Sequence, residues 1–151
     1  MQQVKVRIFQ QSAVRNRLKL MGAQFLGSWT EKDTYFLQPA ECFLKIKRMK
    51  GAAFLVRMCR EGQWGLKKDA KPLKDADRKE KELSEKFGVT GVIEKRVHSY
   101  SYRGSSISIH SLPAIGDFLI IEGKLSETRP ILKKLGIEKP EFVSLAFSEM
   151  A

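Results

Sequence analysis

The sequence predicts an α+β protein of one domain, spanning residues 1–151, with an antiparallel sheet that closes into an eight-stranded β-barrel flanked by helices. Three observations lead to this prediction. The length of 151 residues suits a single domain. Several stretches alternate apolar and polar residues with a period of two, which is typical of strands. Short connections of the hairpin kind join most of these stretches, and such connections build antiparallel sheets.

The first strand is expected over residues 4–9, VKVRIF. Its apolar residues alternate with Lys5 and Arg7, so one face of the strand is apolar and the other is basic. A helix is expected over residues 12–22, with Ser12 as its N-cap and a glycine at its end.

Extended structure is expected over residues 23–37, with an interruption at Gly27-Ser28. A hairpin should follow over residues 43–62, turning at Lys50-Gly51. The next stretch, residues 63–76, is rich in lysine and is expected to be a loop.

Asp75 is expected to cap a second helix that ends at Gly88. Two strands joined at Arg103-Gly104 should follow, and then a further strand over residues 116–124. A third helix is expected to begin near Ser126.

The chain is strongly basic, with 28 lysines and arginines against 17 acidic residues and a formal charge of +11. This charge favours a polyanionic partner, although a solvated basic surface would also account for it. No apolar run approaches the ~20 residues of a membrane span, and the first residues form a strand pattern instead of a signal peptide. We therefore expect a cytoplasmic protein with no membrane partner. The oligomeric state is left open.

The two cysteines, Cys42 and Cys59, are expected to be reduced in such a protein. Together with His98 and His110 they lack the usual spacing of zinc ligands, so no zinc site is expected.

Basic or polar residues recur at alternate positions of several expected strands. The pairs are Lys5 and Arg7, Lys45 and Lys47, and Arg96 and His98. Such a face usually lies against solvent. In a barrel wide enough to have a lumen the same residues could point inward, where convergent positive charge would bind phosphate.

The stretch IHSLPAIGDFLIIEG, residues 109–123, resembles the C-terminal signature of the CYTH, or triphosphate tunnel, superfamily. The expected elements before and after it follow the family's order along nearly the whole chain. The family includes class IV adenylyl cyclases, thiamine triphosphatases and inorganic triphosphatases. The resemblance implies an eight-stranded tunnel in which basic residues hold a triphosphate and acidic residues hold Mg²⁺ or Mn²⁺.

This sequence departs from the family pattern at the metal-binding positions. Gln3 and Lys5 stand where the family has glutamates, and His110 replaces an aspartate. Ile120 replaces another glutamate, and only Glu122 remains. Because Mg²⁺ requires oxygen ligands, we expect Mg²⁺ or Mn²⁺ to bind weakly at most, through Glu122 with a smaller contribution from Glu94.

We therefore expect a divergent family member that binds a small polyanion, such as triphosphate, a nucleotide or polyphosphate, with weak or no metal-dependent catalysis. The expected phosphate contacts are Lys5, Arg7, Lys45, Lys47 and Arg96, and the possible acid–base residues are His98 and His110. One alternative is an active triphosphatase or adenylyl cyclase with an altered metal site. A second is a nucleic-acid-binding module that uses Tyr100, Tyr102 and Arg103 to stack on bases.

Overall fold

The computed structural model describes residues 2–150, which form nine strands and four helices. The strands are β1 (Gln2–Ile8), β2 (Gln24–Phe36), β3 (Cys42–Met49), β4 (Ala52–Glu61), β5 (Gly65–Pro72), β6 (Val89–Tyr102), β7 (Ser105–Leu112), β8 (Gly116–Gly123) and β9 (Glu141–Phe142). The helices are α1 (Gln11–Leu20), α2 (Ala76–Phe87), α3 (Leu125–Lys134) and α4 (Phe147–Met150). Over the described range, no helix combines the length and the apolar character needed to cross a membrane.

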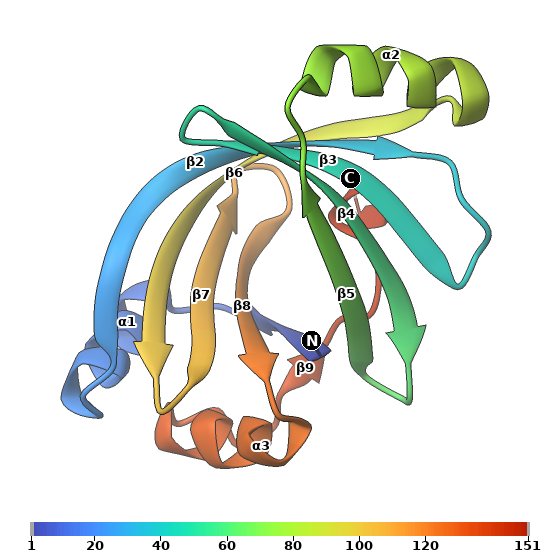
Figure 1. Ribbon diagram of the computed structural model, residues 1–151. Helices are drawn as coiled ribbons and strands as arrows, with labels where there is room; N and C mark the ends of the chain where they lie inside the picture. Colours follow the sequence, from blue (N-terminus) through green and yellow to red (C-terminus); the bar gives the residue numbers. More distant parts are fainter. Residues whose placement is uncertain (1, 151) are drawn as a thin grey trace.

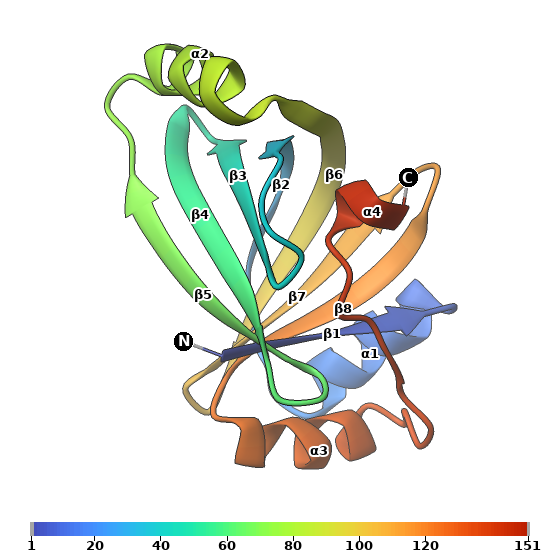
Figure 2. The same ribbon diagram turned by 90° about the vertical axis from the view of Figure 1, so that its right-hand side faces the viewer.

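Eight strands form one closed antiparallel barrel in the order β5-β4-β3-β2-β6-β7-β8-β1 (Figures 1 and 2). The ring closes because Gln2 and Gln3 of β1 pair with Lys67 and Leu66 of β5. The predicted fold class, an α+β protein with an eight-stranded antiparallel barrel, is confirmed.

The C-terminal segment, residues 141–150, completes the barrel wall where β1 and β5 are no longer paired. Phe142 of β9 pairs with Val6 of β1, and the Val143 amide donates to the Lys5 carbonyl at 2.8 Å. The Trp64 ring, from the turn before β5, stacks on Phe142 with 5.3 Å between centroids. The chain then continues into α4, which lies beside the barrel strands in Figure 2.

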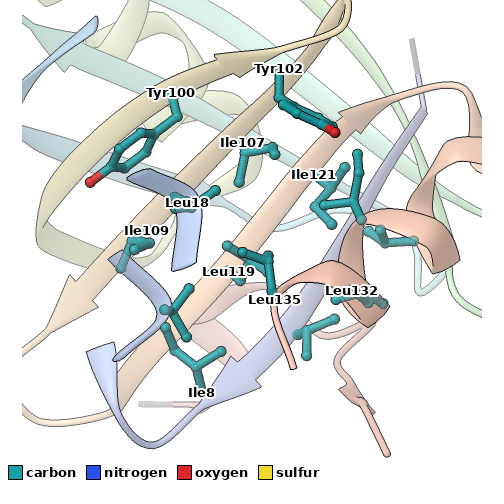
Figure 3. Close-up of a cluster of buried hydrophobic side chains, with 14 residues drawn as sticks. Ile8, Leu18, Tyr100, Tyr102, Ile107, Ile109, Leu119, Ile121, Leu132 and Leu135 are labelled. Carbon is teal, nitrogen blue, oxygen red and sulfur yellow. The ribbon is translucent and has the colours of Figure 1, made fainter. Parts of the chain in front are cut away.

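Helices α1 and α3 cover the outer face of β1 and of β6–β8 (Figure 3). The apolar face of β1 packs here, as its alternation predicted, and it meets Leu18 of α1 and Leu132 of α3. The basic face of β1 therefore points to the inside of the barrel. Burial of this outer layer is the main source of stability for the half of the barrel that contains β1.

Helix α2 packs on the outer face of β2–β4 through Leu83, which contacts Phe36, Leu44 and Ile46. Its start agrees with the prediction, because the Asp75 carboxylate accepts a hydrogen bond from the Arg78 amide at 3.1 Å.

The start of α1 differs from the prediction. Gln10 occupies the N-cap position without a side-chain cap, so the assignment of Ser12 as the cap is wrong. The predicted turns at Lys50-Gly51 and Arg103-Gly104 are confirmed. Both residues of each turn have positive φ, which is the geometry of a tight hairpin turn.

The prediction that residues 63–76 form a loop is wrong, because β5 occupies most of this stretch and pairs with β4 along its length. The many lysines of this stretch conceal the alternation of apolar and polar residues that would predict a strand. Lys67 and Lys71 face solvent, whereas Lys68 faces the barrel interior, so both faces of β5 carry charge. The expected interruption at Gly27-Ser28 is only a register shift next to Gly27 within one long strand, β2.

Cys42 and Cys59 form a disulfide, so the expectation that they are reduced is wrong. They lie directly opposite each other on β3 and β4, a relation that their separation of 17 residues in the sequence does not reveal.

We predict that reduction of this disulfide lowers the free energy of unfolding by up to about 3 kcal/mol, because a cross-link of this loop length restricts the unfolded chain. Denaturant unfolding with and without a reductant measures the change. The control is the Cys42→Ser/Cys59→Ser variant, whose stability should not respond to the reductant. Labelling of two thiols in unreduced, unfolded protein would contradict the cross-link.

Candidate functional site

The barrel interior, here called the lumen, holds a cavity of about 200 Å³ that is lined by an unusual number of charged side chains. Its lysines are Lys5, Lys45, Lys47, Lys68 and Lys95, and its acidic residues are Glu31, Asp33 and Glu122. Five ammonium groups face three carboxylates, so the lumen has an excess of two positive charges when all eight groups are ionised.

Asp33 is the centre of the ion pairs in the lumen. Its side chain is fully buried, and Lys45 and Lys95 reach it at 2.8 and 2.9 Å. Burial alone would raise the pKa of Asp33, but the two ammonium groups hold this pKa well below its usual range. Glu31 lies further from its lysine partners, 3.7 Å from Lys95 and 3.9 Å from Lys47, and its other oxygen accepts a hydrogen bond from Trp29 Nε1 at 2.8 Å.

Lys5 is buried, with 3% of its surface exposed, yet within residues 2–150 no carboxylate lies within ion-pair distance of it. Its ammonium group donates to the carbonyl of Leu145 and lies 4.1 Å from the centroid of the Phe147 ring. Both contacts are weaker than an ion pair with a carboxylate. Burial lowers the pKa of Lys5 well below the ordinary lysine value, and the nearby charges of Lys45 and Lys95 lower it further.

Two further residues of the lumen, Lys47 and His110, have lowered pKa values and therefore carry a positive charge less readily. Burial, with the charge of Lys45, lowers the pKa of Lys47 to about 8. Burial and the charge of Lys95 lower the pKa of His110 well below its usual value, so this imidazole is neutral. The His110 Nε2 lies 2.9 Å from the Ser108 hydroxyl, and its Nδ1 has no hydrogen-bond partner among the described residues.

The C-terminal segment fills part of the lumen. Phe147 packs 5.0 Å from Phe118, ring to ring, and 6.1 Å from the His110 ring. An ion pair between Glu149 and Arg60 of β4, 3.1 Å apart, joins the segment to the opposite wall. The cavity is therefore what remains of the lumen beside Phe147.

A cleft of about 1360 Å³ lies at the end of the barrel nearest α2, and we call it the mouth. It shares Glu31, Met49 and Lys95 with the lumen, so the two spaces adjoin. Its lining mixes cations with apolar groups, including Arg7, Arg48, Lys50, Phe54 and Leu73.

Arg7 is fixed at this mouth. Its guanidinium donates to the carbonyl of Ile115 at 3.1 Å and lies over the Phe118 ring at 4.8 Å. It also packs on Gly116, where a Cβ atom would come within 2.8 Å of Nη1. A residue with a side chain at position 116 would have to displace Arg7, and it would also be strained by the φ of 131°.

The structure brings only part of the predicted site together. Lys5, Lys45, Lys47, His110 and Glu122 face the lumen, and Arg7 lines the mouth. Glu94, Arg96 and His98 do not face the lumen, because the inner positions of β6 are the odd-numbered residues Ile93, Lys95, Val97 and Ser99. Glu94 and Arg96 nevertheless line the mouth together with Arg7, whereas His98 lines neither space. The expected orientation of β6 was wrong by one residue.

Three charged residues of the lumen were not predicted from the sequence: Glu31, Asp33 and Lys95. The signal was available in TEKDTYF, where Glu31 and Asp33 are in phase with Tyr35, a residue of the barrel interior. Lys95 was obscured because its inner neighbours on β6 are apolar, so the strand did not show a continuous polar face on that side.

The residues of the lumen do not fit a divalent metal ion. Glu122 pairs with Lys68 at 2.9 Å, and Glu94 lines the mouth but not the lumen. Across residues 2–150, no three His, Cys, Asp or Glu side chains gather closely enough to hold a metal. Glu31 and Asp33 are already held by ammonium groups, which would have to be displaced before either carboxylate could coordinate Mg²⁺.

The residues expected to stack on nucleic acid do not form an open surface. Tyr100 and Tyr102 are buried on the outer side of the barrel, in the core formed with α1 and α3 (Figure 3). The Tyr102 hydroxyl accepts a hydrogen bond from Lys134 at 2.7 Å, and the guanidinium of Arg103 lies 5.2 Å from the centroid of the Tyr102 ring.

No family model and no curated protein sequence matches the chain. Among solved structures, the fold resembles the PH1012 protein from Pyrococcus horikoshii OT3, with a TM-score of 0.86 and 21% identity over 99% of each chain. It also resembles a candidate adenylate cyclase from Vibrio parahaemolyticus, with a TM-score of 0.74 and 13% identity over 98% of this chain and 95% of that one.

A third similar structure is HpAC1 from Hippeastrum, a candidate adenylyl cyclase reported to have a dominant triphosphatase activity. Its TM-score is 0.65, with 13% identity over 96% of this chain and 91% of that one. At these identities the likeness concerns the fold alone, an eight-stranded antiparallel barrel with flanking helices.

We predict that Lys5→Met raises the free energy of unfolding near neutral pH by about 1 kcal/mol or more, because it removes a buried charge that lacks an anionic partner. Because the pKa of Lys5 is lowered in the folded protein, the unfolded chain binds more protons than the folded one. The contribution of this lysine to the free energy of unfolding therefore rises as the pH approaches 10.5, the ordinary pKa of lysine. The gain in Lys5→Met should therefore shrink as the pH approaches 10. Urea unfolding at several pH values measures both effects.

The matched control is Asp33→Asn, which removes the partner of Lys45 and Lys95 instead of an unpaired charge. It should lower the free energy of unfolding by about 3–5 kcal/mol. A comparable loss of stability in Lys5→Met would contradict the view that the Lys5 charge is unpaired.

Proposed function

We propose that this protein binds a short polyphosphate-bearing anion, such as triphosphate, a nucleotide or polyphosphate, in the lumen, with little or no metal-dependent catalysis. We further propose that it is a divergent member of the CYTH superfamily. The observation that carries the first proposal is the buried ammonium group of Lys5. Isolated buried charges are costly, and ionisable groups with strongly perturbed pKa values gather at functional sites. A bound anion would supply the partner that Lys5 lacks.

The neighbouring lysines support this proposal because carboxylates hold their ammonium groups in place and leave some of the N–H donors unused. An ammonium group has three N–H donors. Lys45 uses one of them on Asp33, and Lys68 uses one on Glu122. The carboxylates thus orient the lysines, and the remaining donors can bind phosphate oxygens without a metal ion.

The volumes of the lumen cavity and the mouth indicate which part of such a ligand each of them would hold. The lumen cavity, at about 200 Å³, is smaller than the roughly 300–1,000 Å³ of ordinary ligand pockets, so it suits a phosphate chain. The mouth, at about 1360 Å³, has room for an attached organic group, and it joins the lumen at Lys95.

A second candidate function is an active triphosphatase or adenylyl cyclase with an altered metal site. The triphosphatase activity reported for HpAC1, which has the same fold, favours it. The pairing of Glu122 with Lys68 opposes it.

We predict that tripolyphosphate binds in EDTA and that Lys5→Met weakens this binding at least tenfold, since the variant loses a charge-assisted hydrogen bond. Binding should take up protons, because an anion raises the pKa values of Lys5 and Lys47 that the free lumen holds down. The affinity should therefore rise as the pH falls from 9 to 7. Calorimetry in buffers of different ionisation enthalpy measures affinity and proton uptake together.

The matched control is Lys67→Met, which removes the same charge from the outer face of β5, next to the inward-facing Lys68. Its affinity for tripolyphosphate should equal that of the wild type. An equal loss in both variants would mean that the anion binds the basic surface and not the lumen.

We predict that excess Mg²⁺ or Mn²⁺ weakens tripolyphosphate binding, because the metal neutralises the anion and the lumen offers it no cluster of ligands. No phosphate should be released, and Glu122→Gln should bind the anion as well as the wild type does, since it leaves Lys68 unpaired. Release of phosphate that requires the metal and disappears in Glu122→Gln would overturn the proposal and support the second candidate.

A further inference from the structure

A second basic site lies on the outside of the barrel, on the other side of the wall from the lumen. It is a groove of about 490 Å³ between α1 and the first residues of β2, and we call it the α1 groove. Its lining residues are Ser12, Arg15, Asn16, Lys19, Ala23, Phe25 and Tyr100. The lumen and the mouth share none of these residues, so this is a separate site.

The helix side of the groove is a single polar face of α1. Residues 12, 15, 16 and 19 follow the spacing that places side chains on one side of a helix. Arg15 and Lys19 are both exposed, one helical turn apart, and neither forms an ion pair with a described residue. The helix QSAVRNRLKL contains no acidic residue, so no carboxylate of its own offsets these charges.

The floor of the groove is aromatic. The Phe25 ring lies 5.2 Å from the Tyr100 ring, tilted by 53°, and Phe25 is 51% exposed. Tyr100 is buried and belongs to the outer core, so it holds Phe25 at the surface. An exposed aromatic ring beside two cations resembles the platforms on which bases stack.

We propose that the α1 groove binds single-stranded nucleic acid, with a base stacked on Phe25 and backbone phosphates on Arg15 and Lys19. The cations alone would suit any anion, whereas the aromatic floor selects a ligand that carries flat rings as well as phosphates. The groove volume falls within the roughly 300–1,000 Å³ of ligand pockets and is large enough to accept a nucleotide unit. The inference does not depend on the function proposed for the lumen.

The test is fluorescence anisotropy with a labelled eight-residue oligouridine that has a 5′-hydroxyl, so that no terminal phosphate chain is available to the lumen. Arg15→Met/Lys19→Met should weaken binding at least tenfold and reduce the slope of log affinity against log salt by about 1.4, or ~0.7 for each lost phosphate contact. Phe25→Leu, a half-exposed position, should weaken binding at least fivefold and leave the salt slope unchanged.

The matched control for charge is Arg78→Met/Lys86→Met, which removes two exposed cations from α2. This variant and Lys5→Met should bind the oligonucleotide as the wild type does.

Equal weakening in the α2 variant would show binding to diffuse surface charge, and loss in Lys5→Met would place the oligonucleotide in the lumen. Either result, or unchanged binding in both groove variants, would overturn the proposal. Tripolyphosphate binding, measured with the same groove variants, tests the function proposed for the lumen separately from the function proposed for the groove.

Discussion

The interior of this barrel depends on the pairing of Asp33 with Lys45 and Lys95. Two ammonium groups at 2.8 and 2.9 Å from one carboxylate are stable in a buried place because Asp33 offsets part of their charge and Glu31, 3.7 Å from Lys95, supplies a second negative charge. With Glu31 nearby, Asp33 allows several lysines to share one lumen. It also fixes where their ammonium groups lie, so the remaining donors converge on the same small cavity. Without this buried carboxylate, the lysines would repel one another and the barrel would have to open to water.

The pairing leaves Lys5 outside the network, and this division connects stability to function. Among the residues that the structure describes, Lys5 contacts the carbonyl of Leu145 and the ring of Phe147, both from the C-terminal segment, and no carboxylate. The same segment completes the wall beside β1, so the residues that shield Lys5 and those that extend this wall belong to one segment. A fold chosen for stability alone would place a methionine at this position. The buried cation at this position is the reason for proposing that the lumen binds an anion.

Much of this fold could be predicted from sequence because its signals are local. The alternation in VKVRIF gave the correct face of β1, and the capping side chain of Asp75 gave the start of α2. The candidate site was predicted less well, because a lumen reverses the usual rule that polar faces point to solvent. On β6 both faces mix polar and apolar residues, and Arg96 was assigned to the inside in place of Lys95. The Cys42–Cys59 disulfide depends on which residues β3 and β4 bring opposite each other, and no local pattern reports that.

The most direct test of this account is an NMR titration of labelled lysine side chains, with Lys5→Met used to assign the Lys5 signal. The account predicts that the Lys5 ammonium group of the free protein titrates well below the ordinary lysine range. It also predicts that tripolyphosphate in EDTA moves this titration upward. A Lys5 signal that titrates like a solvent-exposed lysine, and that tripolyphosphate does not shift, would contradict the account.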